Sequence, residues 1–234
     1  MSNSCYRLTR IAARLVSFPF ARVRIWHAPG AIEPASAAVL VSNHISHFDP
    51  ILLSFLLRRP IDWMTTEEFY DNPLLAAWLR GLNTFPVDRS RPDRRALRVG
   101  VERLRAGRLV GVFPEGGIRA GATSIFGGAS PKSGATALAR LAAAPIVPCM
   151  IFGTDRLYAP RSWWPGPPRV PVWLAVGAPF SVADLNESSA NERLSQAVRD
   201  LGAAMVEQFQ LAPEDLPATP QHRKGRDARP NESK

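Results

Sequence analysis

The chain has 234 residues, 46% of them hydrophobic and 21% charged, an ordinary globular balance with enough apolar material for one α/β domain and a short extension. Its net charge of +9 comes almost wholly from arginine, since only Lys132, Lys224 and Lys234 are lysines; a GC-rich coding bias is one cause, and the surface suits phosphates, acidic lipids or nucleic acid. The two cysteines, Cys5 and Cys149, have no disulfide-framework or metal-type spacing, which favours a reducing compartment.

The first predicted element is an amphipathic helix over residues 4–20. Its apolar side chains recur every three to four residues: Leu8, Ile11, Leu15 and Phe18. Arginines form a stripe beside them: Arg7, Arg10 and Arg14. Such a helix fits a membrane surface, where arginine heads reach lipid phosphates; a helix packed on the core with a solvated basic edge is the alternative. The arginines argue against a signal peptide, and no apolar stretch reaches the roughly 20 residues that a spanning helix needs.

After this helix, short apolar segments alternate with segments of helical spacing. The predicted strands are 23–26, 38–41, 61–64, 85–87, 109–113, 146–152 and 170–176. The predicted helices are 50–57, 73–79, 93–106, 131–143 and 189–209. The alternation predicts an α/β fold, with a mostly parallel or mixed sheet flanked by helices and preceded by the amphipathic helix. We therefore expect a membrane-surface helix at 1–20, an α/β domain at 21–211 and a disordered basic tail at 212–234.

The first of three polar clusters, NHISHFDP, follows the strand predicted at residues 38–41. His44 stands on the loop, and Asp49 precedes the proline that opens a helix. An aspartate at this position is also a favoured helix cap, and a loop histidine often makes only a backbone hydrogen bond. A carboxylate beside an imidazole, however, fixes its tautomer and stabilises the imidazolium, which makes the histidine a general base. His44 and Asp49 are therefore the candidate catalytic pair.

The second and third clusters also follow predicted strands. In GLNTFPVDRS, Arg89 lies on a loop where its guanidinium could grip a phosphate, whereas most arginines after it form a solvated stripe on a helix. In FPEGGIR, the glycines allow backbone amides to approach a ligand closely. Glu115 could there hold a substrate hydroxyl or fix Arg89 or Arg119, although a strand-end Glu-Gly is also a simple turn.

Taken in order, NHISHFD, GLNTFPVDR, FPEGGIR and APIVP resemble the motifs of the glycerolipid (PlsC-like) acyltransferase family, which includes 1-acylglycerol-3-phosphate acyltransferase. The resemblance covers residues 20–185 and implies an α/β fold. It implies that His44 is the general base and Asp49 its orienting partner. The strand of Pro148 would line the acyl or acceptor pocket.

The resemblance also implies a binding site for the acceptor. Arg89 and the pair Glu115 and Gly116 would bind its phosphate and glycerol. Arg119 is a further candidate binding residue, but its position departs from the family pattern. The family commonly reads FPEGTR, whereas two residues separate Gly116 from Arg119 in this chain.

The implied reaction transfers an acyl group from acyl-CoA or acyl-ACP to the hydroxyl of a lysophospholipid, with 1-acyl-glycerol-3-phosphate giving phosphatidic acid. No Gly-x-Ser-x-Gly elbow or nucleophilic cysteine is placed for an acyl-enzyme, so transfer is expected to be direct. The expected partners are the thioester donor, with acyl carrier protein as one carrier, the acceptor lipid and an anionic membrane surface. No metal or cofactor is expected, and the protein would lie peripherally at the cytoplasmic face of the cell membrane.

Several alternatives stay open from the sequence. The acceptor could be another lysolipid or an amino-lipid. A metallohydrolase could use His44, His47 and Asp49, but the other histidines, His27 and His222, do not complete a ligand set. A non-catalytic binder of anionic lipid would use the arginine stripes. Nucleic acid is not expected, because the chain has no recognised reading motif.

Overall fold

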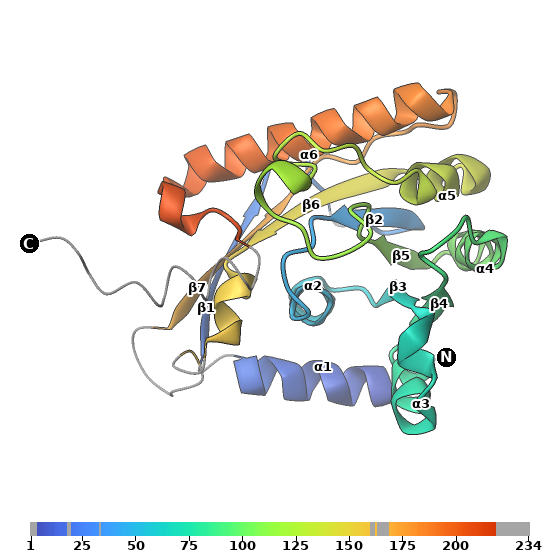
Figure 1. Cartoon of the computed structure of the whole chain (residues 1–234), viewed down its shortest axis with the longest axis horizontal. Helices are drawn as coiled ribbons and strands as arrows, with labels where there is room; N and C mark the ends of the chain where they lie inside the picture. The colour runs from blue at the N-terminus through green and yellow to red at the C-terminus, as the bar shows by residue number, and fades with distance from the viewer. Residues whose placement is uncertain (1–3, 18–19, 33, 160–161, 163–168, 219–234) are drawn as a thin grey trace, which may run out of the picture.

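The computed structural model describes residues 4–17, 20–32, 34–159, 162 and 169–218, which form a seven-stranded sheet with helices on both faces (Figure 1). The strands are β1 Ala21–His27, β2 Ala38–Ser42, β3 Ile61–Thr66, β4 Phe85–Val87, β5 Leu109–Val112, β6 Ile146–Phe152 and β7 Val170–Val176. The α-helices are α1 Ser4–Ser17, α2 Asp49–Leu56, α3 Pro73–Gly81, α4 Arg94–Arg105, α5 Gly134–Ala142 and α6 Glu187–Phe209. Short 3-10 helices include η1 Glu67–Tyr70, η2 Gly121–Thr123, η3 Thr154–Tyr158 and η5 Pro213–Asp215.

The sheet has the order β1-β7-β6-β2-β5-β3-β4, and its neighbours are parallel except for the antiparallel pair β6 and β7. The predicted mostly parallel or mixed sheet is therefore confirmed. Because β2, β3, β4 and β5 run in the same direction, the loops after β2, β4 and β5 leave the sheet at one edge. These three loops carry the three polar clusters of the sequence.

Two apolar cores lie on opposite faces of the sheet. Side chains of a strand alternate between faces, so Val39 and Val41 of β2 pack on the side of α4, α5 and α6, whereas Ala38 and Leu40 pack on the side of α2. All four side chains are fully buried. Slipping β2 by one residue would exchange the two sets, so this pattern fixes the register of the strand that carries the His44 loop.

Helix α1 packs on α2 and α3 (Figure 1), and its buried Tyr6 forms hydrogen bonds with α2 and the start of β3. The hydroxyl of Tyr6 accepts the N–H of Ile61 at 3.1 Å and lies 3.4 Å from the carbonyl oxygen of Ser54. Leu8 and Ile11, from the predicted apolar stripe, are 67% and 59% exposed, so these two side chains do not pack on the core. Of the other predicted stripe members, Arg7 is exposed, and the side chains of four lie outside those that the structure describes: Arg10, Arg14, Leu15 and Phe18.

The start of the predicted tail needs a correction. Residues 213–215 form η5, and Ala218 is buried, with its N–H donating to Asp155 Oδ2 at 3.2 Å. Asp215 also pairs with Arg156 at 2.7 Å, so specific polar contacts hold residues 212–218 against the domain in place of the expected disorder. Residues 219–234 lie outside the described part of the chain. No helix among the residues described has the length and apolarity to cross a membrane.

Candidate active site

The loop after β2 places an imidazole beside a buried carboxylate. His44 Nδ1 lies 3.0 Å from Asp49 Oδ2, and the side-chain exposures are 14% for the histidine and 0% for the aspartate. Because Nδ1 faces the carboxylate, Nε2 is the ring nitrogen left to take a proton from a substrate. A carboxylate in this position favours the Nδ1–H tautomer and stabilises the imidazolium that forms on proton uptake.

Asp49 is held by its own set of donors. Its Oδ2 also accepts the backbone N–H groups of Ile45 and Ser46 at 2.7 and 2.8 Å. Its Oδ1 accepts the hydroxyl of Thr154, from η3, at 2.5 Å. The residue at the cap position of α2 is Phe48, which makes no side-chain cap, so helix capping does not account for Asp49. The carboxylate instead organises the turn that presents His44.

Aromatic side chains fix the plane of the imidazole. The ring of His44 stacks on Phe113, just past β5, with centroids 4.1 Å apart and 17° between the planes. Phe113 in turn stacks on Trp63 of β3 at 4.7 Å. The indole fits because the facing residue of β5 is Gly111, where an added Cβ would meet the ring at 2.4 Å. This stack was not predicted from the sequence, in which Gly111, a glycine inside an apolar strand, is the signal for it.

Glu115, after β5, ties two loops together. Its Oε2 accepts the N–H of His44 at 2.8 Å, and its Oε1 accepts the N–H of Ile125 at 3.0 Å. Burial raises the pKa of Glu115 from 4.5 to about 7, against the lowering effect of these hydrogen bonds and of the charge of Arg119. Both carboxylate oxygens accept backbone N–H groups, which the sequence did not predict, and the expected contact with a substrate hydroxyl stays a prediction.

Basic groups surround the loop beside this carboxylate. The guanidinium of Arg89 donates to the carbonyl oxygen of Gly116 at 3.3 Å. The backbone N–H of Arg119 donates to the carbonyl oxygen of His44 at 2.8 Å, and its side chain is exposed. Gly116 has φ +69°, and an added Cβ there would meet Lys132 Cε at 2.6 Å, so the lysine side chain lies across the glycine.

Lys132 was not predicted as a site residue. Lysine is rare in this arginine-rich chain, which has three, and this rarity could have drawn attention to Lys132. Its approach to Gly116, however, depends on the fold. The structure thus gathers all the predicted site residues at one edge of the sheet and adds Lys132, Thr154 and Phe113.

The remaining candidates from the sequence lie nearby or in the core. His47 Nδ1 lies 2.5 Å from the Tyr158 hydroxyl, and burial together with the charge of His44 lowers the pKa of His47. No group of three His, Cys, Asp or Glu side chains within the described part of the chain is arranged to hold a metal ion. Burial raises the pKa of the Cys149 thiol to about 12, so this thiol does not supply a thiolate nucleophile near neutral pH. Pro148 lies buried within β6, paired with Val41.

Comparison with known proteins gives consistent matches. A 1-acyl-sn-glycerol-3-phosphate acyltransferase of Bacillus subtilis is 27% identical over 173 residues, which is 74% of this chain and 81% of that protein. A Streptococcus pneumoniae protein of the same name is 24% identical over 151 residues, and this chain spans about half of its length (52%).

The fold has a counterpart among solved structures. The 1-acyl-sn-glycerophosphate (LPA) acyltransferase PlsC of Thermotoga maritima superposes with a TM-score of 0.61, over 85% of this chain and 80% of that one, at 21% identity. The family model described as Acyltransferase matches residues 25–152, a segment that runs from β1 through the His44 loop to the end of β6. This match extends over more than half of the 234 residues, and the chain belongs to the acyltransferase family.

Proposed function

We propose that the protein transfers a fatty acyl group from an acyl thioester to the free hydroxyl of a lysophospholipid, with 1-acyl-glycerol-3-phosphate as acceptor and phosphatidic acid as product. The observation that carries the proposal is the pairing of His44 with the buried Asp49 at an edge that also presents exposed basic groups. The names of the two related proteins support this choice of acceptor.

In the proposed reaction His44 Nε2 takes the proton of the acceptor hydroxyl as the oxygen attacks the thioester carbonyl. The C–O bond forms, the C–S bond breaks, and the imidazolium returns its proton to the departing thiolate. Asp49 stabilises the transient imidazolium without itself being protonated. General-base assistance of this kind is worth about 10²–10⁴-fold in rate. The thioester is the activated group, so the reaction needs no metal or bound cofactor, and coenzyme A and acyl carrier protein both suit it as carriers.

The acceptor phosphate would lie against the loop of Gly116. Arg89 and Lys132 both reach this glycine. Arg119 has an exposed side chain, and its backbone N–H donates to the carbonyl oxygen of His44. Guanidinium groups bind phosphate oxygens through two parallel hydrogen bonds, and ammonium groups add a point charge. Binding the phosphate on this side would bring the glycerol hydroxyl toward the imidazole.

We further propose that α1 and α3 contact an anionic membrane surface. Apolar side chains stay exposed on the two helices and on η1: Leu8, Ile11, Phe69, Leu74 and Trp78. Arg7 is exposed on α1, and one basic residue near an anionic surface adds about 1 kcal/mol to binding. Helix α2, which begins at Asp49, packs on α1 and so links this surface to the His44 loop (Figure 1).

The test is a panel of acceptors and donors presented with membranes, with the lipid product read by mass spectrometry. Wild-type protein should form phosphatidic acid from 1-acyl-glycerol-3-phosphate and one of the two thioesters. Product from another lysolipid or an amino-lipid alone would replace the proposed acceptor. Salt-sensitive vesicle binding without product from any acceptor would instead indicate a non-catalytic lipid binder.

A further inference from the structure

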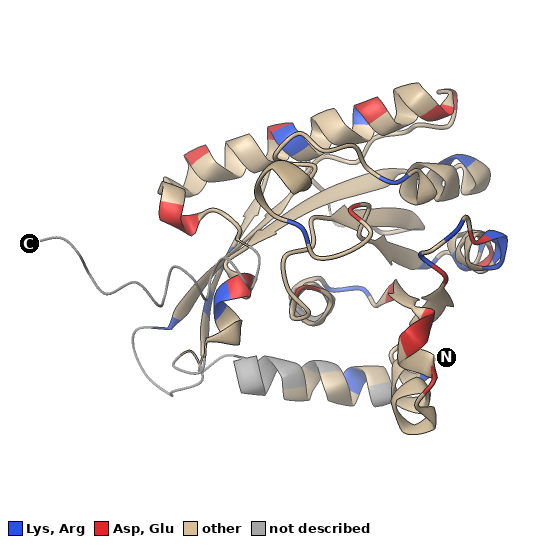
Figure 2. Ribbon diagram, in the orientation of Figure 1, with Lys and Arg blue, Asp and Glu red and all other residues tan. Residues whose placement is uncertain are grey.

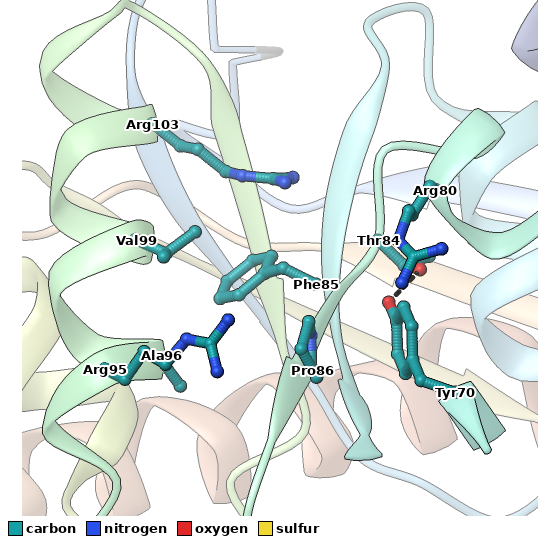
Figure 3. A pocket seen from close by; sticks show the side chains of 9 residues that line it. All are labelled: Tyr70, Arg80, Thr84, Phe85, Pro86, Arg95, Ala96, Val99 and Arg103. Atoms are coloured by element: carbon teal, nitrogen blue, oxygen red, sulfur yellow. Dashed lines mark hydrogen bonds between the residues drawn. The ribbon is translucent and has the colours of Figure 1, made fainter. Parts of the chain in front are cut away.

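A cavity of about 300 Å³ lies at β4, the edge strand of the sheet (Figure 3), and none of its lining residues belongs to the group described around His44. Nine residues line it: Tyr70, Arg80, Thr84, Phe85, Pro86, Arg95, Ala96, Val99 and Arg103. They come from η1, α3, β4 and α4 and from the turn before β4. The family resemblance assigned no role to this group of side chains.

The cavity combines an apolar wall with arginines. Arg95, Val99 and Arg103 are spaced by four residues, so they share one face of α4, and Figure 3 shows this face turned toward Phe85 and Pro86 of β4. Arg80 approaches from α3 on the other side of the strand. Basic residues gather on α4 in the charge view of the molecule (Figure 2).

One of the three arginines is fixed by a buried carboxylate. Arg103 pairs with Asp62 at 3.0 Å and lies over the ring of Phe85, 4.6 Å from its centroid. Asp62 is fully buried and also binds Arg108 through hydrogen bonds of 2.5 and 2.6 Å. Two guanidinium groups therefore share one carboxylate, which leaves the wall at Arg103 with a net positive charge.

The other two arginines keep donors for a ligand. Arg80 lies over the ring of Tyr70 at 5.7 Å, and the charges of Arg80 and Arg103 both oppose the rise in pKa that burial causes in this phenol. Asp93, the nearest carboxylate to Arg95 in sequence, accepts backbone N–H groups as the cap of α4. None of the described lining residues is acidic, and no described carboxylate forms an ion pair with the guanidinium of Arg80 or Arg95.

We propose that this cavity binds a phosphate group through the guanidinium groups of Arg80 and Arg95. The fixed charge of Arg103 adds to the attraction, and the apolar side chains of Phe85 and Val99 contact the rest of the phosphate-bearing molecule. Guanidinium groups suit phosphate because their planar forks give two parallel hydrogen bonds. The proposed function brings two phosphate-bearing molecules to the protein, and only the choice of these two candidates rests on that function. They are a coenzyme A thioester and a phospholipid.

The experiment measures binding to the full chain by isothermal titration calorimetry without an acyl donor. The probes are inorganic pyrophosphate and adenosine 3′,5′-bisphosphate, and vesicles containing phosphatidic acid form a separate sedimentation arm. The double variant Arg80→Gln/Arg95→Gln is compared with Arg94→Gln/Arg98→Gln, which removes the same charge from exposed positions of α4 outside the cavity. The first variant should bind at least about tenfold more weakly, and the second should lose only the small, salt-screened attraction.

The outcomes separate this site from the proposed reaction. Selective loss for the bisphosphate or for the vesicles supports the site and names the source of its phosphate. Equal weakening in both double variants, or no binding of any probe by wild-type protein, overturns it. The exposed single variant Arg95→Gln, with an unchanged circular dichroism spectrum, guards against misfolding. His44→Ala should bind the probes like the wild type, so a failure of acyl transfer leaves this result intact.

Discussion

The carboxylate of Glu115 accepts the backbone N–H of His44 at 2.8 Å, so the loop that presents the imidazole is tied directly to the chain leaving β5. The other oxygen of the same carboxylate holds Ile125. A side chain that the sequence placed on the substrate thus acts on the position of the proposed base. We therefore expect one buried acid to affect both the stability of the fold and the position of His44.

Glu115→Gln should destabilise the fold by about 1–3 kcal/mol, because the amide keeps one acceptor and turns an N–H₂ group toward the second backbone donor. Urea unfolding at about pH 5, where the raised pKa of Glu115 retains most of its contribution to stability, measures the change. Glu102→Gln is the control, because Glu102 is exposed on α4 and its loss should change stability by no more than about 0.5 kcal/mol. Equal free energies of unfolding for the two variants would mean that the carboxylate contacts contribute nothing.

Glu115 should also make stability depend on pH. Its pKa is raised in the folded state from 4.5 to about 7, so the folded protein holds this proton more tightly than the unfolded chain. Its contribution is fully present below pH 4.5, is lost as the pH rises to about 7, and is constant above that. The steepest loss is about 1.4 kcal/mol per pH unit. Plots of the free energy of unfolding against pH for wild type and Glu115→Gln should differ in slope only within this window. Parallel plots there would contradict the raised pKa of Glu115.

Thr154→Val should lower kcat by about tenfold with little change in KM, because it removes the hydroxyl that Asp49 Oδ1 accepts and leaves that oxygen without this donor. Thr154→Ser keeps the hydroxyl and should restore most of the rate. Steady-state kinetics of the two variants measure the effect. Similar losses in both would point to packing around residue 154 as the cause.

Lys132→Gln should raise KM for a phosphate-bearing lysolipid by about tenfold, since one charge-assisted contact beside Gly116 is lost. The effect should disappear with a monoacylglycerol acceptor, which has no phosphate. Arg140→Gln, at an exposed position of α5, is the matched loss of charge. A change that is equal for both acceptors would place Lys132 outside phosphate recognition.

Leu74→Gln should weaken binding to anionic vesicles, because Leu74 is 83% exposed on α3, one of the two helices proposed to contact the membrane. The control is Leu141→Gln, since Leu141 is 56% exposed on α5, across the sheet from α1 and α3 (Figure 1). Co-sedimentation with vesicles reads both variants. Equal retention of the two on vesicles would remove α3 from the proposed membrane surface.

The elements of the fold were predictable because local pattern decides them. The apolar run at residues 146–152 and the segment at 170–176 were predicted with the bounds that β6 and β7 show. Their antiparallel pairing was not predictable, because the apolar pattern of a strand does not encode the direction of its neighbour. The ordered residues 212–218 were missed for a similar reason, since the buried Asp155 and the ion pair with Arg156 hold them from far along the chain.

The proximity of His44 and Asp49 was predictable because five positions separate them on one turn. The supports of this pair were not, since Thr154, Phe113 and Lys132 reach the site only through pairing of β2 with β5 and β6 and through the loops that follow these strands. The backbone contacts of Glu115 were not predictable, because backbone partners carry no signature in the side-chain sequence, and its role in acceptor binding stays a prediction.

The most direct test of the proposed base is the acyl-transfer rate of purified His44→Ala beside that of His47→Ala, with both variants shown by circular dichroism to be folded. The two histidines lie on one loop, but His47 is exposed and bonded to Tyr158, whereas His44 faces Asp49. The proposal predicts that His44→Ala loses at least about 10²-fold in kcat while His47→Ala keeps most of its rate. Wild-type turnover by folded His44→Ala would contradict it.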